Sequence, residues 1–173
     1  MSKLILAAAL AAGIATAANA HVTFETSEAT VGGSWKAVLR VPHGCAGEAT
    51  QTLRVQIPEG VIAVKPMPKA GWRLETVTGK YARSYDYYGT PMSEGVTEIV
   101  WTGELPDAFY DEFVFRAMLT TDLEVGEALY FPVVQECADA AERWIEIPTT
   151  GQDHDSLESP APGVKLLPAA GGH

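Results

Sequence analysis

The feature that most constrains the fold of this chain is a series of short β-type segments at fairly even spacing. Segments rich in Val, Ile, Thr and aromatic residues end at turn signals: WKAVLRV ends at PHG, TLRVQI at PEG, and TEIVW at TGELPD. EFVFRAMLT, ALYFPVVQE and RWIEI follow in the second half. No long stretch of the body shows a persuasive 3.6-residue apolar period. About eight or nine strands predict an all-β fold, either an antiparallel β-sandwich or a small barrel.

Residues 1–20 have the organisation of a secretory signal peptide. Lys3 supplies the basic start, the apolar run LILAAALAAGIATAA follows, and Ala18 and Ala20 occupy the small-residue positions of an A-x-A cleavage site. The run is shorter than the roughly 20 apolar residues that a membrane-spanning helix needs. We expect cleavage after Ala20, no membrane insertion of the mature chain, and a periplasmic or secreted protein that begins at His21. A cut one or two residues away is the alternative.

The mature chain divides into a body and a tail. Residues 21–148 are enough for one domain with its own core. From Thr149 onward the sequence is rich in Gly, Pro, Ser and acidic residues and has little to bury, so we expect a flexible tail over residues 149–173. The tail holds His154 and His173, which we interpret as solvated; the alternative is that QDHD binds a metal loosely.

Cysteine usage agrees with export. Cys45 and Cys137 are the only two cysteines, and in an oxidising compartment we expect them to form a disulfide. The alternative is a thiolate ligand for copper, which in a blue-copper site needs two nearby histidines and a weak axial ligand. After Cys137 the next histidine is His154, in the tail, so the disulfide is the better interpretation.

Charge and missing motifs exclude several function classes. The formal net charge of −10 becomes one unit more negative when the signal peptide leaves, because Lys3 is its only charged residue. We therefore expect no nucleic-acid partner. The chain lacks a G-x-S-x-G elbow, a phosphate loop and an H-E-x-x-H motif, and the body holds only His21 and His43. Three-histidine zinc chemistry in the body is therefore excluded, and we predict no enzyme activity.

An N-terminal histidine has unusual metal chemistry. After cleavage, the α-amine and imidazole Nδ1 of His21 together form a six-membered chelate ring on one metal ion. The amine has an ordinary pKa of about 7.7–8, so it gives up its proton to a metal at little cost. Two nitrogens with an amide or oxygen donor suit Cu(II) above other divalent ions. The alternative, that a histidine merely happens to follow the cut, is equally compatible with the sequence alone.

Strand alternation predicts which residues face the core. Alternate residues of HVTFE, DEFVFRA and RWIEI share a face, because side chains in a strand point alternately to its two sides. The predicted core residues are Val22 and Phe24, Phe113, Phe115 and Ala117, and Ile145 and Ile147. His21, Glu112 and Trp144 are left off that core. Alternation does not predict whether these three side chains meet.

At these residues the sequence resembles the YcnI-like family, a domain of unknown function in exported bacterial proteins. The matching segments are AHVTF, VPHGC, PKAGWRLE, WTGELP, FYDEFVFR, LYFPVVQEC and RWIEIP, which run in order from residue 20 to 148. The resemblance implies a cupredoxin-like or immunoglobulin-like β-sandwich that binds Cu(II) through a monohistidine brace. It assigns the amine and imidazole ligands to His21, an oxygen ligand to Glu112, and a tryptophan close to the metal to Trp144.

The function that the resemblance implies is Cu(II) sequestration, or delivery to another periplasmic copper protein. Two alternatives remain: a copper-dependent oxidative enzyme, which needs a second histidine from His43 or the tail, and a metal-free interaction module. His43, in the turn VPHGC, we interpret as structural or exposed rather than as a ligand. Some members of the family lack the two cysteines, so a disulfide here is interpreted as a staple of a subgroup.

Overall fold

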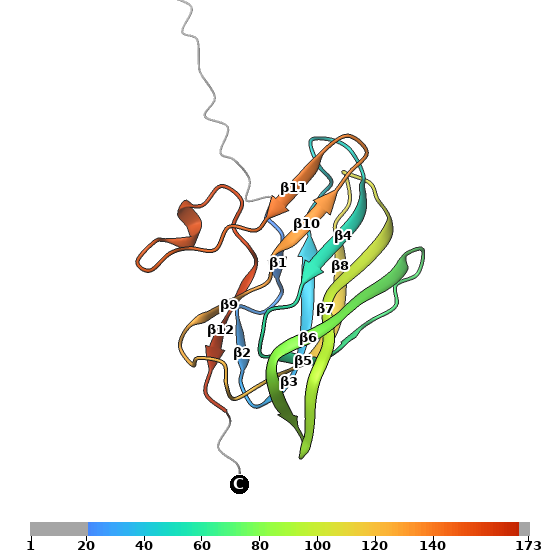
Figure 1. The fold of residues 1–173 in the computed structure, drawn as a ribbon. Helices are drawn as coiled ribbons and strands as arrows, with labels where there is room; N and C mark the ends of the chain where they lie inside the picture. Colours follow the sequence, from blue (N-terminus) through green and yellow to red (C-terminus); the bar gives the residue numbers. More distant parts are fainter. Residues whose placement is uncertain (1–20, 170–173) are drawn as a thin grey trace, which may run out of the picture.

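The computed structural model describes residues 21–169, and the fold is all-β (Figure 1). The predicted signal peptide, and His173, lie outside the described residues. The described strands are β1 Thr23–Phe24, β2 Glu28–Thr30, β3 Gly33–Val41, β4 Thr50–Gln56, β5 Val61–Pro66, β6 Arg73–Tyr87, β7 Thr90–Leu105, β8 Asp111–Leu119, β9 Ala128–Tyr130, β10 Val133–Glu136, β11 Ala141–Trp144 and β12 Gly163–Leu167. A single-turn 3₁₀ helix, His154–Ser156, precedes β12.

The strands form two large sheets and one small one. The sheets have the orders β1-β3-β8-β5, β11-β10-β4-β7-β6 and β2-β12-β9. All pairings between these strands are antiparallel except that of β2 with β12. The two large sheets contribute to one core, which confirms the predicted antiparallel β-sandwich. In Figure 1 the small sheet lies at one side of the sandwich, with β2, β9 and β12 next to each other.

Aromatic side chains fill the centre of the core. Phe24, Trp35, Phe115 and Phe131 pack against one another with ring centroids 5.1–6.5 Å apart. They come from β1, β3, β8 and the link between β9 and β10. Edge-to-face packing at these distances adds to the free energy gained from burial alone. The cluster therefore ties the two-residue strand β1 to the body of the sandwich.

Two predicted segments are organised differently from the expectation. The β6–β7 hairpin is much longer than WRLETVT and TEIVW suggest, because the pairing continues to Tyr87↔Thr90. Its turn residues Tyr88 and Gly89 have φ of 52° and 83°, the left-handed pair that a tight hairpin turn requires. The segment ALYFPVVQE is split in two, with β9 in the small sheet and β10 in a large one. Pro132 lies between them, where the chain changes sheets.

The predicted flexible tail is wrong for its second half. Gly163–Leu167 forms β12, which pairs with both β2 and β9. Val164 and Leu166 are almost fully buried in the core. The sequence pattern did not predict this strand, because VKLL is a short run among Gly and Pro. Its place in the middle of the small sheet depends on β2 and β9, which are far away in the sequence. The domain therefore extends past residue 148.

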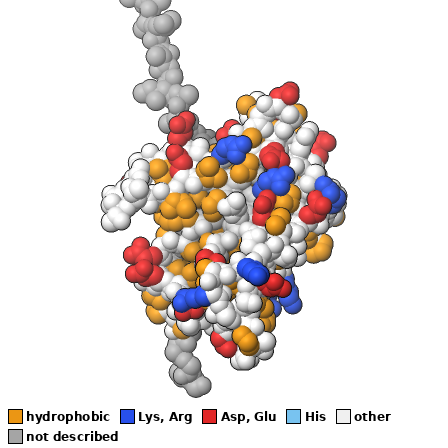
Figure 2. Space-filling view, in the orientation of Figure 1, with side chains coloured by type: hydrophobic (Ala, Val, Ile, Leu, Met, Phe, Trp, Pro, Cys, Tyr) orange, Lys and Arg blue, Asp and Glu red, His pale blue; other side chains and the backbone are white. Residues whose placement is uncertain are grey.

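The disulfide between Cys45 and Cys137 is present, as predicted. It joins the turn after β3 to the turn after β10, and both cysteines are buried. On the face drawn in Figure 2, Lys and Arg side chains lie among Asp and Glu side chains rather than in a basic patch. Arg54, for example, makes ion pairs with both Glu98 and Glu136. Among the described residues, no helix is long and apolar enough to cross a membrane.

Candidate metal site at the N-terminal strand

The short strand β1 fixes the position of His21. Val22 and Phe24 are buried, at 1% and 5% exposure, while His21 is half-buried on the opposite face, as alternation predicts. β1 pairs with β3 through Thr23↔Arg40 and Phe24↔Leu39. The Arg40 guanidinium adds a side-chain clamp, because its Nη2 donates to the carbonyl of Phe24 at 3.0 Å. Residues 21–24 are therefore anchored at the edge of the sheet.

Trp144 lies directly beside His21. The two ring centroids are 5.3 Å apart and the planes meet edge to face at 61°. The sequence pattern had placed Trp144 off the core and Ile145 and Ile147 on it, and this prediction of the faces is wrong. Trp144 is 5% exposed, and both isoleucines are exposed.

The cause of the reversal is the end of β11 at Trp144. Trp144 pairs with Val133, which is fully buried, so the register directs the indole toward the core. After Trp144 the chain leaves the strand, and period-2 alternation no longer applies to the two isoleucines. The resemblance placed Trp144 close to a metal at His21, and the structure places its ring beside that of His21; the proximity to a metal stays a prediction.

A pocket of about 520 Å³ opens beside His21. Residues 21–24, which include β1, line it, together with Arg40 and Pro42 at the end of β3 and with Tyr110. A further wall is the segment that precedes β12, including His154, so the tail histidine lines the same pocket as His21. Sequence reasoning did not find this wall, since it assigned the segment to a flexible tail.

His154 is held in place rather than solvated freely. Its ring stacks on Tyr130 with a centroid separation of 5.7 Å and an interplanar angle of 14°. Its Nε2 lies 3.1 Å from the carbonyl oxygen of Ala161, which only accepts hydrogen bonds, so Nε2 donates. Nδ1 lies 3.5 Å from Oδ1 of Asp155. The interpretation of His154 as merely solvated is therefore wrong.

Glu112 lies at the edge of the site rather than against His21. It faces away from the core on β8, as predicted, next to the buried Phe113. Its register partner is Arg40, whose partner on the other side is Thr23. With strands about 4.8 Å apart, two strand spacings separate Glu112 from β1, roughly 10 Å between backbones.

Tyr110 connects Glu112 to the pocket. The Tyr110 hydroxyl donates a hydrogen bond to Oε1 of Glu112, so the carboxylate is directed toward a residue that lines the pocket. Desolvation of the phenol, followed by this hydrogen bond and the charge of Glu112, raises the pKa of Tyr110 to about 12. The phenol is therefore neutral at physiological pH and serves as a donor to the carboxylate.

The α-amine of His21 is the donor that a metal site here would add to the side chains. Within residues 21–169 there is no group of three or more His, Cys, Asp or Glu side chains arranged to hold an ion. The predicted cleavage after Ala20 would expose this amine, on the same residue as the imidazole.

His43 lies in the turn next to the disulfide, as predicted. Its Nδ1 is 2.6 Å from the carbonyl oxygen of Gly44 and 4.0 Å from Oδ1 of Asp107. The carbonyl only accepts, so Nδ1 donates to it. The ring is half-buried. These contacts give His43 a local structural role.

Comparison with known proteins supports the fold and leaves the activity open. A family model described as a domain of unknown function (DUF1775) matches residues 21–166. Among curated proteins the comparison finds no match. An uncharacterised protein from Nocardia farcinica, whose crystal structure reveals an immunoglobulin-like fold, is similar with a TM-score of 0.61 and 22% identity. The match covers 85% of this chain and 98% of that protein.

Proposed function

This chain belongs to the DUF1775 family, and we propose that it is an exported Cu(II)-binding protein whose site is created when the signal peptide is removed. The observation that carries the proposal is the position of His21. Its imidazole lies at the mouth of a pocket, edge-on to a buried tryptophan, at the residue where the predicted cleavage exposes a new amine. The amine and Nδ1 of His21 are the two nitrogen ligands in this proposal.

Glu112 is the proposed oxygen ligand. Support comes from its orientation toward Tyr110, which lines the same pocket as His21. A mixed nitrogen and oxygen donor set favours Cu(II) over Cu(I), which prefers sulfur ligands. For one metal ion to bind both Glu112 and His21, the two side chains must extend toward each other across the end of β3. The hydrogen bond from Tyr110 restricts the position of the Glu112 carboxylate.

The size and openness of the pocket support a role in sequestration or delivery. A volume of about 520 Å³ far exceeds that of one ion, since even a water molecule takes only about 30 Å³. The remaining space lets a ligand from a periplasmic copper protein approach the metal and take it over. Export is supported by the Cys45–Cys137 disulfide, which is typical of oxidising compartments.

The test is Cu(II) binding by the mature chain that begins at His21. We expect one tight equivalent in a competition titration. Residues that only hydrogen-bond to a metal ligand typically contribute about 10- to 100-fold to the affinity. We expect His21→Ala to weaken Cu(II) binding by more than that, because it removes a ligand. Tight binding that survives in the His21→Ala protein contradicts the proposal. Glu112→Gln tests the oxygen ligand separately, since it keeps the shape of the side chain and removes its charge.

A copper-dependent oxidative enzyme is the second candidate, and one observation favours it. His154 lines the same pocket as His21, so a second imidazole is present there. In this alternative His154→Ala abolishes tight copper binding, and the copper protein turns over ascorbate and peroxide on a polysaccharide. In the leading proposal His154→Ala leaves the affinity within a few-fold and no turnover occurs.

A further inference from the structure

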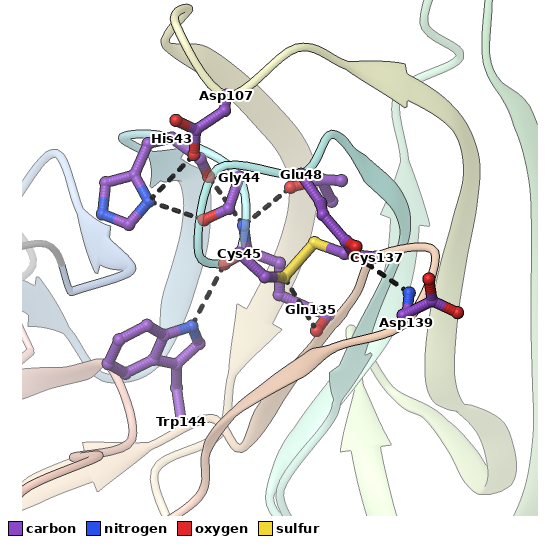
Figure 3. The surroundings of a disulfide bond; sticks show 10 residues. His43, Gly44, Cys45, Glu48, Asp107, Gln135, Cys137, Asp139 and Trp144 are labelled. Atoms are coloured by element: carbon purple, nitrogen blue, oxygen red, sulfur yellow. Dashed lines mark hydrogen bonds and ion pairs between the residues drawn. A yellow bond between two sulfur atoms is a disulfide. The ribbon is translucent and has the colours of Figure 1, made fainter.

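Gln135 is a buried polar residue that the copper proposal does not use. It lies on β10 and is only 1% exposed. The side-chain Nε2 of Gln135 is 2.6 Å from the carbonyl oxygen of His43 and 2.7 Å from Oγ1 of Thr50. Its Oε1 is 3.3 Å from Nε1 of Trp144 (Figure 3). A buried amide is costly unless it is paired, and here both of its ends are paired.

The chemistry of these partners fixes the orientation of the amide. The carbonyl of His43 only accepts hydrogen bonds, so the NH₂ group of Gln135 must face it. The indole N–H of Trp144 only donates, so the oxygen of Gln135 must face the ring. A flipped amide would lose both contacts. Gln135 therefore has one favourable orientation, and that orientation holds the indole nitrogen of Trp144.

The disulfide clamps the same two segments that Gln135 joins. Cys45 lies two residues after His43, and Cys137 lies two residues after Gln135. The disulfide and the hydrogen bond from Gln135 to His43 therefore both connect the turn after β3 to the end of β10. In Figure 3 the disulfide, Gln135 and Trp144 form a continuous group. The ring of Trp144 also packs edge to face against that of His21.

We propose that Gln135 is a positioning residue for the metal site, which fixes the indole of Trp144 against the imidazole of His21. This inference rests on the proposed Cu(II) function. Gln135 does not touch the metal; it holds Trp144, which limits the ring orientations open to His21. The competing interpretation is that core packing alone fixes Trp144 and that Gln135 contributes only to stability.

The two interpretations differ in what Gln135→Met changes. Methionine has a similar length and no amide, so the indole loses its acceptor while the volume is kept. Thr50→Val is the matched control, because it removes one partner of Gln135 and leaves the contact with Trp144. In the copper-free protein we expect Gln135→Met to move the indole N–H resonance of Trp144, and Thr50→Val to leave it nearly unchanged.

With copper, Gln135→Met should weaken Cu(II) binding by about 10- to 100-fold and alter the electron paramagnetic resonance spectrum. Thr50→Val should change the affinity by less than about threefold. In a Trp144→Phe background, Gln135→Met should have little further effect, because residues that act through one partner are not additive. Gln135→Asn, which is one methylene shorter, provides the same test if Gln135→Met does not fold.

The outcomes separate this inference from the function on which it rests. If the wild-type mature chain binds no Cu(II), the proposed function fails, and the metal-site role of Gln135 fails with it. If the wild type binds and a folded Gln135 variant keeps the same affinity and spectrum, the positioning role alone is overturned. An additive effect of Gln135→Met in the Trp144→Phe background also overturns it.

Discussion

Removing the disulfide should cost this domain a large part of its stability. Cys45 and Cys137 are 92 positions apart, and cross-linking a loop of that size lowers the entropy of the unfolded chain by an amount worth about 4.6 kcal/mol at 25 °C. A domain of this size is typically stable by about 5–15 kcal/mol. The double variant Cys45→Ala, Cys137→Ala should therefore fold but unfold much more easily.

Urea denaturation followed by far-ultraviolet circular dichroism measures the effect. With a slope of about 2 kcal/mol per molar urea, the midpoint should fall by roughly 2 M. The reduced wild-type protein is the control and should resemble the double variant. A loss below about 1 kcal/mol would refute the reasoning, because it would show that the unfolded chain is not restricted by the cross-link.

Three further predictions test the site and the domain boundary. Trp144→Phe should remove most of the fluorescence quenching that one equivalent of Cu(II) produces, because Trp144 is the indole packed edge to face against the imidazole of His21; undiminished quenching contradicts this. Glu112→Gln should lower the pKa of Tyr110 below about 12 without returning it to the ordinary value, because desolvation, the largest cause of the shift, remains while the hydrogen bond and the charge of Glu112 are weakened or lost; absorbance at 295 nm across an alkaline titration measures it, and an unchanged curve contradicts the hydrogen bond. Truncation after Pro148 should destabilise or unfold the domain, because it removes β12, whereas truncation after Ala169 should leave the stability unchanged. A fully stable fragment that ends at Pro148 contradicts the extended domain boundary.

The fold class was readable from the sequence because it depends on local signals. Turn residues at even spacing and period-2 alternation predicted the strands that carry Phe24, Phe113 and Phe115 correctly. The errors concern information that is not local. β12 pairs with β2 and β9, which are distant in the sequence, and a short apolar run among Gly and Pro does not reveal those partners.

The site was predictable in part for the same reason. His21 followed from the cleavage motif and from the chemistry of an N-terminal histidine. The face of Trp144 was assigned wrongly, because the pairing with Val133 decides it and the alternating isoleucines after it lie outside the strand. His154 and Gln135 were not predicted as neighbours of the site, since only the register of distant strands brings them there.

The most direct test of the central claim is the Cu(II) affinity of the mature chain with its α-amine free and with it acetylated. Acetylation is preferable to a one-residue extension, because a Gly-His terminus offers copper its own amine, amide nitrogen and imidazole. We expect acetylation to weaken binding by at least about 100-fold, close to the loss in His21→Ala, since both break the chelate. Equal affinities for the free and acetylated proteins would contradict it.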